Sequence, residues 1–214
     1  MDTLNKNIYM LAACLSALAG FVDAVGFMYL GGYFISFMSG NSTRLSVTFI
    51  GGEMNSFFLL FGIIFLFVMG AMLGSLVRHF TKAPPVAVSV LVLLTVLLFA
   101  AAISFEMGFG YLAIMLMTLA MGAENSTFQR GGDMVVGLTY MSGTLVKLGQ
   151  KWAEAITGGR KTAWIPYLLL WLGLIAGGAL GALSFQAFGL HSLWVATFVS
   201  LLLTSLTAWK KLSL

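Results

Sequence analysis

Apolar residues run along this chain in long stretches, rather than in the short spaced or alternating patterns of soluble helices and strands. Six of these stretches have about the 20 residues that a helix needs to cross a bilayer. They cover residues 8–30, 55–77, 86–105, 109–129, 164–186 and 190–209. The ten-residue alternating segments of a membrane barrel do not occur, so the pattern predicts an all-α polytopic membrane protein.

Two further segments, residues 34–51 and 134–157, are apolar but carry Ser, Gly, Thr and a basic residue near their middle. If both cross the membrane, the chain has eight spans and its halves run parallel. If both enter and return, the chain has about six transmembrane helices plus two broken or re-entrant helices, and its halves are inverted. Non-helical backbone at membrane depth is tolerated only against protein or a water-filled cavity.

The two interrupted segments repeat one motif. Met38-Ser39-Gly40-Asn41-Ser42-Thr43-Arg44-Leu45 returns as Met141-Ser142-Gly143-Thr144-Leu145-Val146-Lys147-Leu148. Other features match at a similar offset of about half the chain, as expected for a duplicated unit. We therefore expect a single integral membrane domain, 1–214, built from two inverted-topology repeats, 1–106 and 107–214.

Glycines four residues apart follow each copy of the motif, Gly70 with Gly74, and Gly173 with Gly177 and Gly181. Small residues on one helix face allow close backbone approach between helices in lipid. These faces predict tight contacts inside the chain, and the alternative is a homodimer through the same glycine-rich faces.

Composition and charge support a membrane location. Apolar residues make up 60% of the chain and charged residues only 8%, against about a quarter charged in soluble domains. The net charge of +4 is what basic cytoplasmic loops produce, and it does not indicate nucleic acid. The single cysteine, Cys14, excludes an internal disulfide and a cysteine-cluster metal site.

The loop charges favour six spans over eight. In the six-span arrangement one side receives only Glu53, Glu106 and His191. The other side receives every loop lysine and arginine: Lys6, Arg78, Lys82, Arg130, Lys151, Arg160, Lys161, Lys210 and Lys211. The positive-inside rule then predicts a multi-pass protein of the bacterial cytoplasmic (inner) membrane, with both termini cytoplasmic.

Four ionisable residues are expected at membrane depth: Asp23, Glu124, Arg44 and Lys147. Asp23 aligns with Asn125, which directly follows Glu124, and the two basic residues occupy matching places in the motif. A charge at this depth is costly unless it is paired or hydrated. The four groups either form two salt bridges, one in each half, or share a polar centre that binds a substrate.

The sharper interpretation is an anion site at the two broken helices near the bilayer midplane. A half-helix that starts there presents free N–H groups and the positive end of its dipole. Removal from water disfavours the charged form of a carboxyl group, so we expect Asp23 and Glu124 to take up protons. The remaining candidate binding residues belong to the motif: Ser39, Gly40, Asn41, Thr43 and Arg44 in the first copy, and Ser142, Gly143, Thr144 and Lys147 in the second.

The run Gly20-Phe21-Val22-Asp23-Ala24-Val25-Gly26-Phe27, followed by Phe37 to Leu45, resembles the YoaK family of small bacterial integral membrane proteins. Glu124-Asn125 followed by Ser142 to Leu145 is similar to the second-half motif of that family. The resemblance implies a membrane protein over essentially the whole chain, and it makes Asp23, Asn41, Thr43, Arg44 and Asn125 the better candidates. It implies no substrate.

The sequence therefore predicts a small secondary transporter or exporter of a small anion or weak acid, with proton coupling, in contact with the lipid bilayer. The alternatives are a passive channel of the same architecture and a non-transporting scaffold or assembly protein. The sequence contains no H-E-x-x-H, no G-x-S-x-G and no His–carboxylate set at the spacing of an enzyme motif, so we expect neither an enzyme nor a metal or other cofactor.

Overall fold

The computed structural model describes residues 6–81, 86–130, 133–134 and 136–210. These residues are nearly all helical, as the apolar pattern predicts. The α-helices of this part of the chain are α1 (Lys6–Tyr29), α2 (Met38–Ile50), α3 (Met54–Phe80), α4 (Val86–Glu106), α5 (Gly110–Glu124), α6 (Met141–Ile156), α7 (Ile165–Phe188) and α8 (Leu193–Trp209). Two 3-10 helices, η1 (Asn125–Phe128) and η2 (Gly189–Ser192), and the antiparallel strands β1 (Gln129–Arg130) and β2 (Asp133–Met134) complete them.

Four helical segments within the described residues are long and apolar enough to cross a membrane. They are Lys6–Tyr29, Met54–Phe80, Val86–Glu106 and Ile165–Trp209, and the last contains α7, η2 and α8. The stretch expected to span at 109–129 is different, because α5 has only 15 residues and passes into η1 at Asn125. The second half therefore has a break in its first helix that apolar length alone does not reveal.

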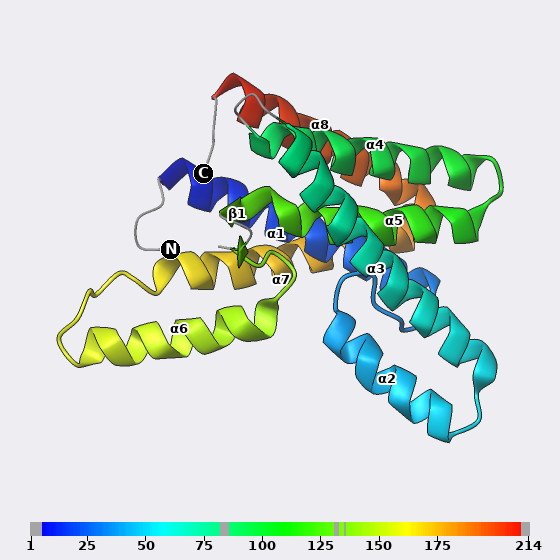
Figure 1. Cartoon of the computed structure of the whole chain (residues 1–214), viewed down its shortest axis with the longest axis horizontal. Coiled ribbons are helices and arrows are strands. Elements are labelled where there is room, and N and C mark those ends of the chain that lie inside the picture. Colours follow the sequence, from blue (N-terminus) through cyan, green and yellow to red (C-terminus); the bar gives the residue numbers. More distant parts are fainter. Residues whose placement is uncertain (1–5, 82–85, 131–132, 135, 211–214) are drawn as a thin grey trace.

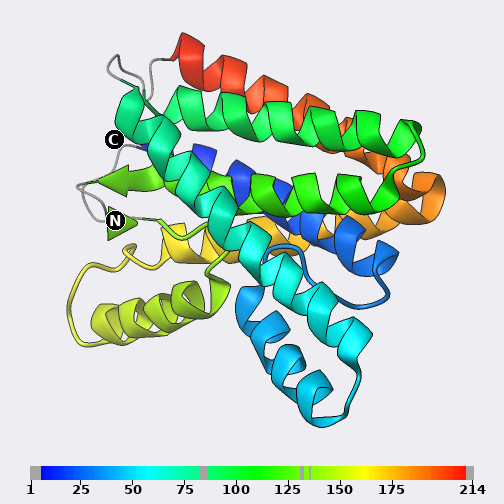
Figure 2. The same cartoon turned by 45° about the vertical axis from the view of Figure 1, so that its right-hand side comes forward.

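Helices α1, α4, α5, α7 and α8 run alongside one another, and α3 crosses them obliquely (Figures 1 and 2). Helices α2 and α6 lie outside this bundle, where α2 packs on α3 and α6 packs on α7. With 13 and 16 residues, neither is long enough to cross a bilayer alone. The two helices begin near each other and then diverge.

The main helix contacts join one half of the chain to the other, since α1 packs on α7 and α3 packs on α5. A Cβ added at Gly177 would clash with the carbonyl oxygen of Ala17, and one added at Gly70 with that of Leu119. These two contacts are equivalent in the two halves, because Gly70 corresponds to Gly177 and Ala17 to Leu119 at offsets of about half the chain. The glycine faces are therefore covered inside one chain, so they are not free for the homodimer that the sequence allowed.

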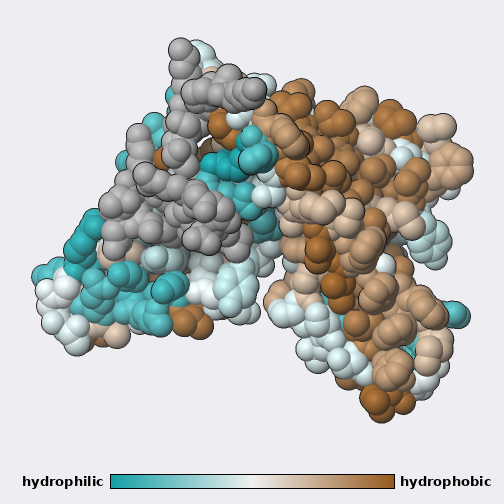
Figure 3. Space-filling view, in the orientation of Figure 1, coloured by the Kyte–Doolittle hydropathy of each residue, from teal (hydrophilic) through white to brown (hydrophobic). Residues whose placement is uncertain are grey.

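The outer surface is apolar over α3 and α4 (Figure 3). Large side chains there, such as Phe58, Phe65 and Val96, are more than half exposed. A soluble protein does not expose a contiguous apolar surface of this kind, so lipid is the solvent that suits it.

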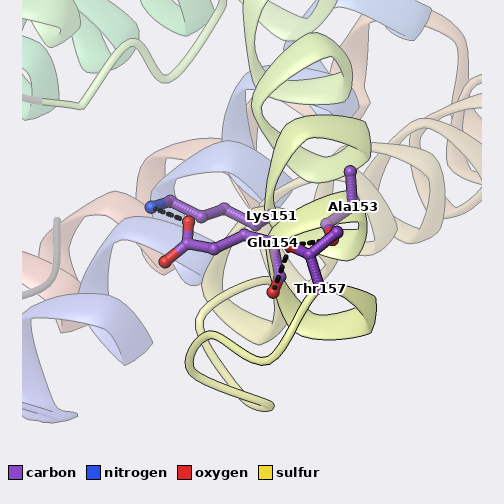
Figure 4. Close-up of polar contacts among 4 residues, drawn as sticks. All are labelled: Lys151, Ala153, Glu154 and Thr157. Carbon is purple, nitrogen blue, oxygen red and sulfur yellow. Dashed lines mark hydrogen bonds and ion pairs between the residues drawn. The ribbon is translucent and has the colours of Figure 1, made fainter.

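Hydrophilic residues instead gather over α6 (Figure 3). Near the end of this helix, Lys151 Nζ lies 2.6 Å from Glu154 Oε2. The Thr157 hydroxyl donates to the carbonyl oxygens of Ala153 and Glu154, which closes the last turn (Figure 4). A helix end of this composition suits the polar boundary of a membrane rather than its apolar interior.

Candidate functional site

A cavity of about 340 Å³ lies between the beginnings of α2 and α6. We call it the central cavity. Both copies of the repeated motif contribute to it, together with α3 and the segment that follows α5. Its lining residues are Ser36, Phe37, Met38, Ser39, Phe67, Ala71, Asn125, Ser126, Gln129, Thr139, Tyr140, Met141 and Ser142.

Each half-helix presents its positive end to the central cavity. The first described helical bonds run from Asn41 N–H to Phe37 O and from Thr144 N–H to Tyr140 O. The N–H groups before them have no partner inside the helix, which is the general condition of a helix N-terminus. Ser39 and Ser142, in these first turns, are exposed and line the cavity. Two sets of donors and two dipoles thus meet at one place.

Asp23 anchors the loop that leads into α2. Its Oδ1 accepts hydrogen bonds from the backbone N–H groups of Ile35 and Ser36, each at 2.7 Å. In the second half Asn125 takes the same place, where its Oδ1 accepts from Thr139 N–H at 3.5 Å and its Nδ2 donates to the Thr139 hydroxyl at 3.0 Å. Asp23 therefore positions a cavity wall, and Asn125 both positions the other wall and lines the cavity.

Asn41 and Thr144, at the matching fourth position of each copy of the motif, are buried. Asn41 pairs with the backbone of Phe34, accepting from its N–H at 3.1 Å and donating to its carbonyl at 2.7 Å. The Thr144 hydroxyl donates to Tyr140 O at 3.2 Å. Thr43 likewise donates to Ser39 O. These three side chains stabilise the half-helices and their entry loops, and they do not line the central cavity.

Gly40 and Gly143 have a role that the sequence does not indicate. A Cβ at Gly40 would meet the ring of Phe37, and one at Gly143 would meet the ring of Tyr140. Each glycine makes room for the aromatic side chain that precedes its half-helix. The sequence made both glycines candidate binding residues, but contact with a ligand is not needed to explain them.

The two basic residues of the motif lie in different environments. Arg44 donates to Gly32 O, and its guanidinium lies 4.5 Å from the ring centroid of Tyr33. Lys147 is exposed and lines a neighbouring groove of about 700 Å³, which shares Tyr140 and Ser142 with the central cavity. We call this the α6 groove. Arg44 thus holds the loop before α2, and Lys147 is available to solutes that enter the groove.

The alternative of two salt bridges, one in each half of the chain, is wrong. Within the described part of the chain, Asp23 and Arg44 bind different backbone groups rather than each other. Neither carboxylate oxygen of Glu124 has a partner among the described residues, although this side chain is fully buried. The four ionisable groups therefore do not gather into one shared centre.

Sequence reasoning missed several polar residues of the central cavity: Ser36, Ser126, Gln129 and Thr139. Ser36 and Thr139 stand two residues before the two copies of the motif. The repeat alignment, extended by two residues, would have found them. Ser126 and Gln129 carry no such signal, because they reach the cavity only through the break after α5.

Comparisons with known proteins agree with this membrane fold. A family model described as "Protein of unknown function (DUF1275)" matches residues 11–206. UPF0700 transmembrane protein RA0705 of Rhizobium meliloti (strain 1021) is 37% identical over 195 residues, which are 91% of this chain and 84% of that protein. No solved structure matches. The chain belongs to the DUF1275 family, which agrees with the YoaK resemblance, and it is a transmembrane protein.

Proposed function

We propose that this DUF1275 protein is a small secondary transporter or exporter of a small anion or weak acid, which binds in the central cavity. The observation that carries the proposal is the meeting of the α2 and α6 N-termini across one cavity. Half-helices that point their positive ends at a midplane site are the usual means by which transporters bind anionic groups.

The chemistry of the lining suits an anion without requiring a charged side chain. None of the described residues that line the cavity is acidic or basic, so among them the field comes mainly from the two helix ends. Each end carries roughly half a positive charge. Hydroxyl groups of Ser39 and Ser142 and the amide of Gln129 add neutral donors. The volume is at the lower end of the roughly 300 to 1,000 Å³ typical of small-molecule sites, which favours a compact solute.

The α6 groove offers a route to the cavity. Lys147 and Gln150 line this groove, which shares Tyr140 and Ser142 with the central cavity. A positive charge beside the entrance raises the local concentration of anions. Lys147 therefore serves capture in this proposal, whereas Arg44 serves structure.

The inverted-repeat arrangement is supported by the corresponding contacts of the two halves. Asp23 and Asn125 hold equivalent loops, and α2 and α6 begin after residues with similar backbone angles, φ −89° with ψ 76° at Phe37 and φ −89° with ψ 65° at Tyr140. Helices α2 and α6 have the lengths expected of half-membrane helices. Six crossing helices plus two half-helices remain our interpretation of the span number.

We also infer an inner-membrane location with both termini cytoplasmic. The starts of α1 and α7 and the ends of α6 and α8 lie at one end of the bundle (Figure 1), where the sequence places most of its lysines and arginines. The α4–α5 and α7–α8 connections lie at the other end, where His191 Nδ1 is 2.9 Å from Glu106 Oε1. Lys82, Lys211 and the Arg130 side chain lie outside the described residues.

Ligand-induced stabilisation of the purified protein tests the binding site. Small anions, weak acids and neutral solutes are compared in a thermal unfolding assay of the wild type and of Ser142→Asp. We expect one class of anion to stabilise only the wild type, because the new carboxylate repels it from the cavity. An acidic residue in the first turn of a helix suits the helix dipole, so the variant retains its fold.

Ser56→Asp is the matched control. Ser56 lies in the first turn of α3 and lines a different surface depression. The same substitution there should leave the anion effect unchanged. Stabilisation that survives in Ser142→Asp would reject the central cavity as the binding site, and no stabilisation of the wild type by any anion would reject the proposed substrate class. Flux into liposomes that does not saturate would favour the channel alternative.

Cysteine labelling tests the orientation. In a Cys14→Ala background, Lys161→Cys and Glu53→Cys are treated with a membrane-impermeant maleimide in intact cells. We expect labelling at position 53 and protection at position 161 until the cells are opened. The reverse pattern would invert the proposed topology.

A further inference from the structure

Glu124 completes an apolar face of α5. Counting back from it by helical steps gives Ala120, Met117 and Ala113, each of which has no exposed surface and belongs to the main hydrophobic core. Side chains at these spacings lie on one face of a helix. Glu124 is itself fully buried, so the sequence continues a core face with a carboxyl group.

This face is turned away from α3. The opposite face contacts α3, since Leu119 O and Ala123 O are the atoms that a Cβ at Gly70 and at Gly74 would meet. Residues 119 and 123 are more than 90° around the helix from Glu124 at 100° per residue. Helix α5 packs on α4 as well as on α3, and α4 has no ionisable residue between Val86 and Phe105.

Nothing among the described residues neutralises Glu124. Neither of its oxygens has a hydrogen-bond partner, and the buried Thr127 hydroxyl one turn later has none either. On α3, the guanidinium of Arg78 is occupied by the carbonyl oxygens of Thr127 and Gln129. His79 follows Arg78 at the end of α3, and its ring packs against the ring of Phe80 rather than against Glu124.

The other elements near α5 do not supply a partner. On α1, Asp23 is held by Ile35 and Ser36, and Cys14 is exposed. On β1 and β2, the side chains of Arg130 and Asp133 lie outside the described residues. A carboxylate ion buried without a partner is strongly disfavoured, and such a group becomes neutral instead.

Glu124 also directly precedes part of the wall of the central cavity in the chain. It is the last residue of α5, and the 3-10 segment Asn125–Phe128 begins immediately after it. Two residues of that segment, Asn125 and Ser126, line the cavity. A rearrangement of this short segment would therefore change both the cavity wall and the access of water to the carboxyl group.

We propose that Glu124 is a proton-binding site, which rests on the proposed function as the coupling site of the transporter. In the conformation described here the carboxyl group holds a proton. When the Asn125–Phe128 segment moves and water enters, the O–H bond breaks, the proton passes to water and the carboxylate remains. An anion in the central cavity contacts the same segment, so binding and proton release influence each other.

Asp23, the other carboxyl group expected at membrane depth, does not share this role. Two backbone N–H groups donate to its Oδ1 at 2.7 Å, and such donors stabilise the charged form. Asn125, not Glu124, takes the place of Asp23 in the second half. The two carboxyl groups lie in different environments, because Asp23 has two backbone donors and Glu124 has no partner among the described residues.

Infrared difference spectroscopy of the purified protein tests the protonation state directly. A protonated carboxylic acid has a carbonyl stretch separate from the carboxylate and amide bands. We expect this band at neutral pH in the wild type, its loss in Glu124→Gln, and its loss in the wild type at high pH. Asp23→Asn is the matched control and should leave the band unchanged. A wild type without the band at neutral pH, or a band that survives in Glu124→Gln, would overturn the proposal.

Coupling is tested separately in liposomes. In Glu124→Gln, we expect the anion to stabilise the protein as in the wild type, while stimulation of its transport by a proton gradient is lost. Unchanged stimulation would overturn the coupling role. A failure of anion binding in the wild type would instead reject the proposed function, and the infrared result for Glu124 would stand independently of it.

Discussion

The close approach of α3 to α5 at Gly74 can be tested with one methyl group. A Cβ added there would lie 2.7 Å from Ala123 O, 2.9 Å from Ala123 Cα and 2.9 Å from Ser126 Oγ. Ordinary contact begins at 3.4 Å, so α5 must move by about 0.7 Å to accept alanine, and overpacking of this kind typically costs about 1 to 3 kcal/mol. Alanine also stabilises a helix relative to glycine by up to about 1 kcal/mol.

The net expectation for Gly74→Ala is a loss of about 1 to 2 kcal/mol of stability. For a chain of this size each kcal/mol lowers the Tm by about 2 to 4 °C, so we expect a fall of about 2 to 8 °C in a detergent or nanodisc melting assay. Because Ser126 lines the central cavity, the anion-induced stabilisation should also weaken.

Gly62→Ala provides the control within the same helix. Apart from its chain neighbours and the backbone of its own helix, no heavy atom lies within 4 Å of a Cβ added at Gly62, so this variant gains helix propensity without overpacking. Its Tm should be equal to or above that of the wild type. Equal melting temperatures of Gly74→Ala and Gly62→Ala would show that α3 and α5 do not make this tight contact. They would also refute the inference that the contact shapes the cavity wall.

Three further variants test the polar contacts. Asp23→Ala leaves two N–H groups without an acceptor, which costs about 1 to 3 kcal/mol of stability each. Its Tm should therefore fall well below that of Asp23→Asn, which keeps an acceptor. Equal Tm values of the two variants would contradict the anchoring role. Thr95→Val removes hydroxyl bonds from α4 to Ser200 and Thr204 of α8 at 2.7 and 3.1 Å, and about 0.6 kcal/mol is the average for such bonds in membranes; a Tm at or above that of the wild type would show that the bonds are not made. Glu154→Gln removes a partly exposed ion pair worth at most about 1 kcal/mol, so the Tm should hardly change, and a large fall would mean that this end of α6 is more deeply placed.

The sequence predicted the class of protein and the place of its polar breaks. The hydropathy of the chain indicates that lipid is its solvent, because so few charged residues cannot cover its apolar surface with polar groups. Helices α2 and α6 both begin at the first residue of the repeated motif, Met38 and Met141, since duplicated segments preserve their spacing. Short helices at those places follow from the polar residues that interrupt each apolar segment.

The end of α5 shows where sequence patterns stop. The apolar stretch 109–129 predicts one continuous span, yet the α-helix ends at Glu124 and a 3-10 turn follows. A local change from α to 3-10 geometry leaves hydropathy unchanged, so the sequence gives no sign of it. Ser126 and Gln129 enter the cavity wall for this reason alone.

Only the tertiary structure decided the partners of the charged residues. The repeated motif suggested two salt bridges, one in each half of the chain, in which Asp23 pairs with Arg44 and Glu124 with Lys147. In the fold, however, Asp23 binds the backbone of the loop before α2, Arg44 binds Gly32 O, and Glu124 binds no described residue. Pairing depends on where the loops bring charged groups together in three dimensions. The sequence repeat fixes the positions of the charges along the chain, but it does not fix the direction in which each side chain points.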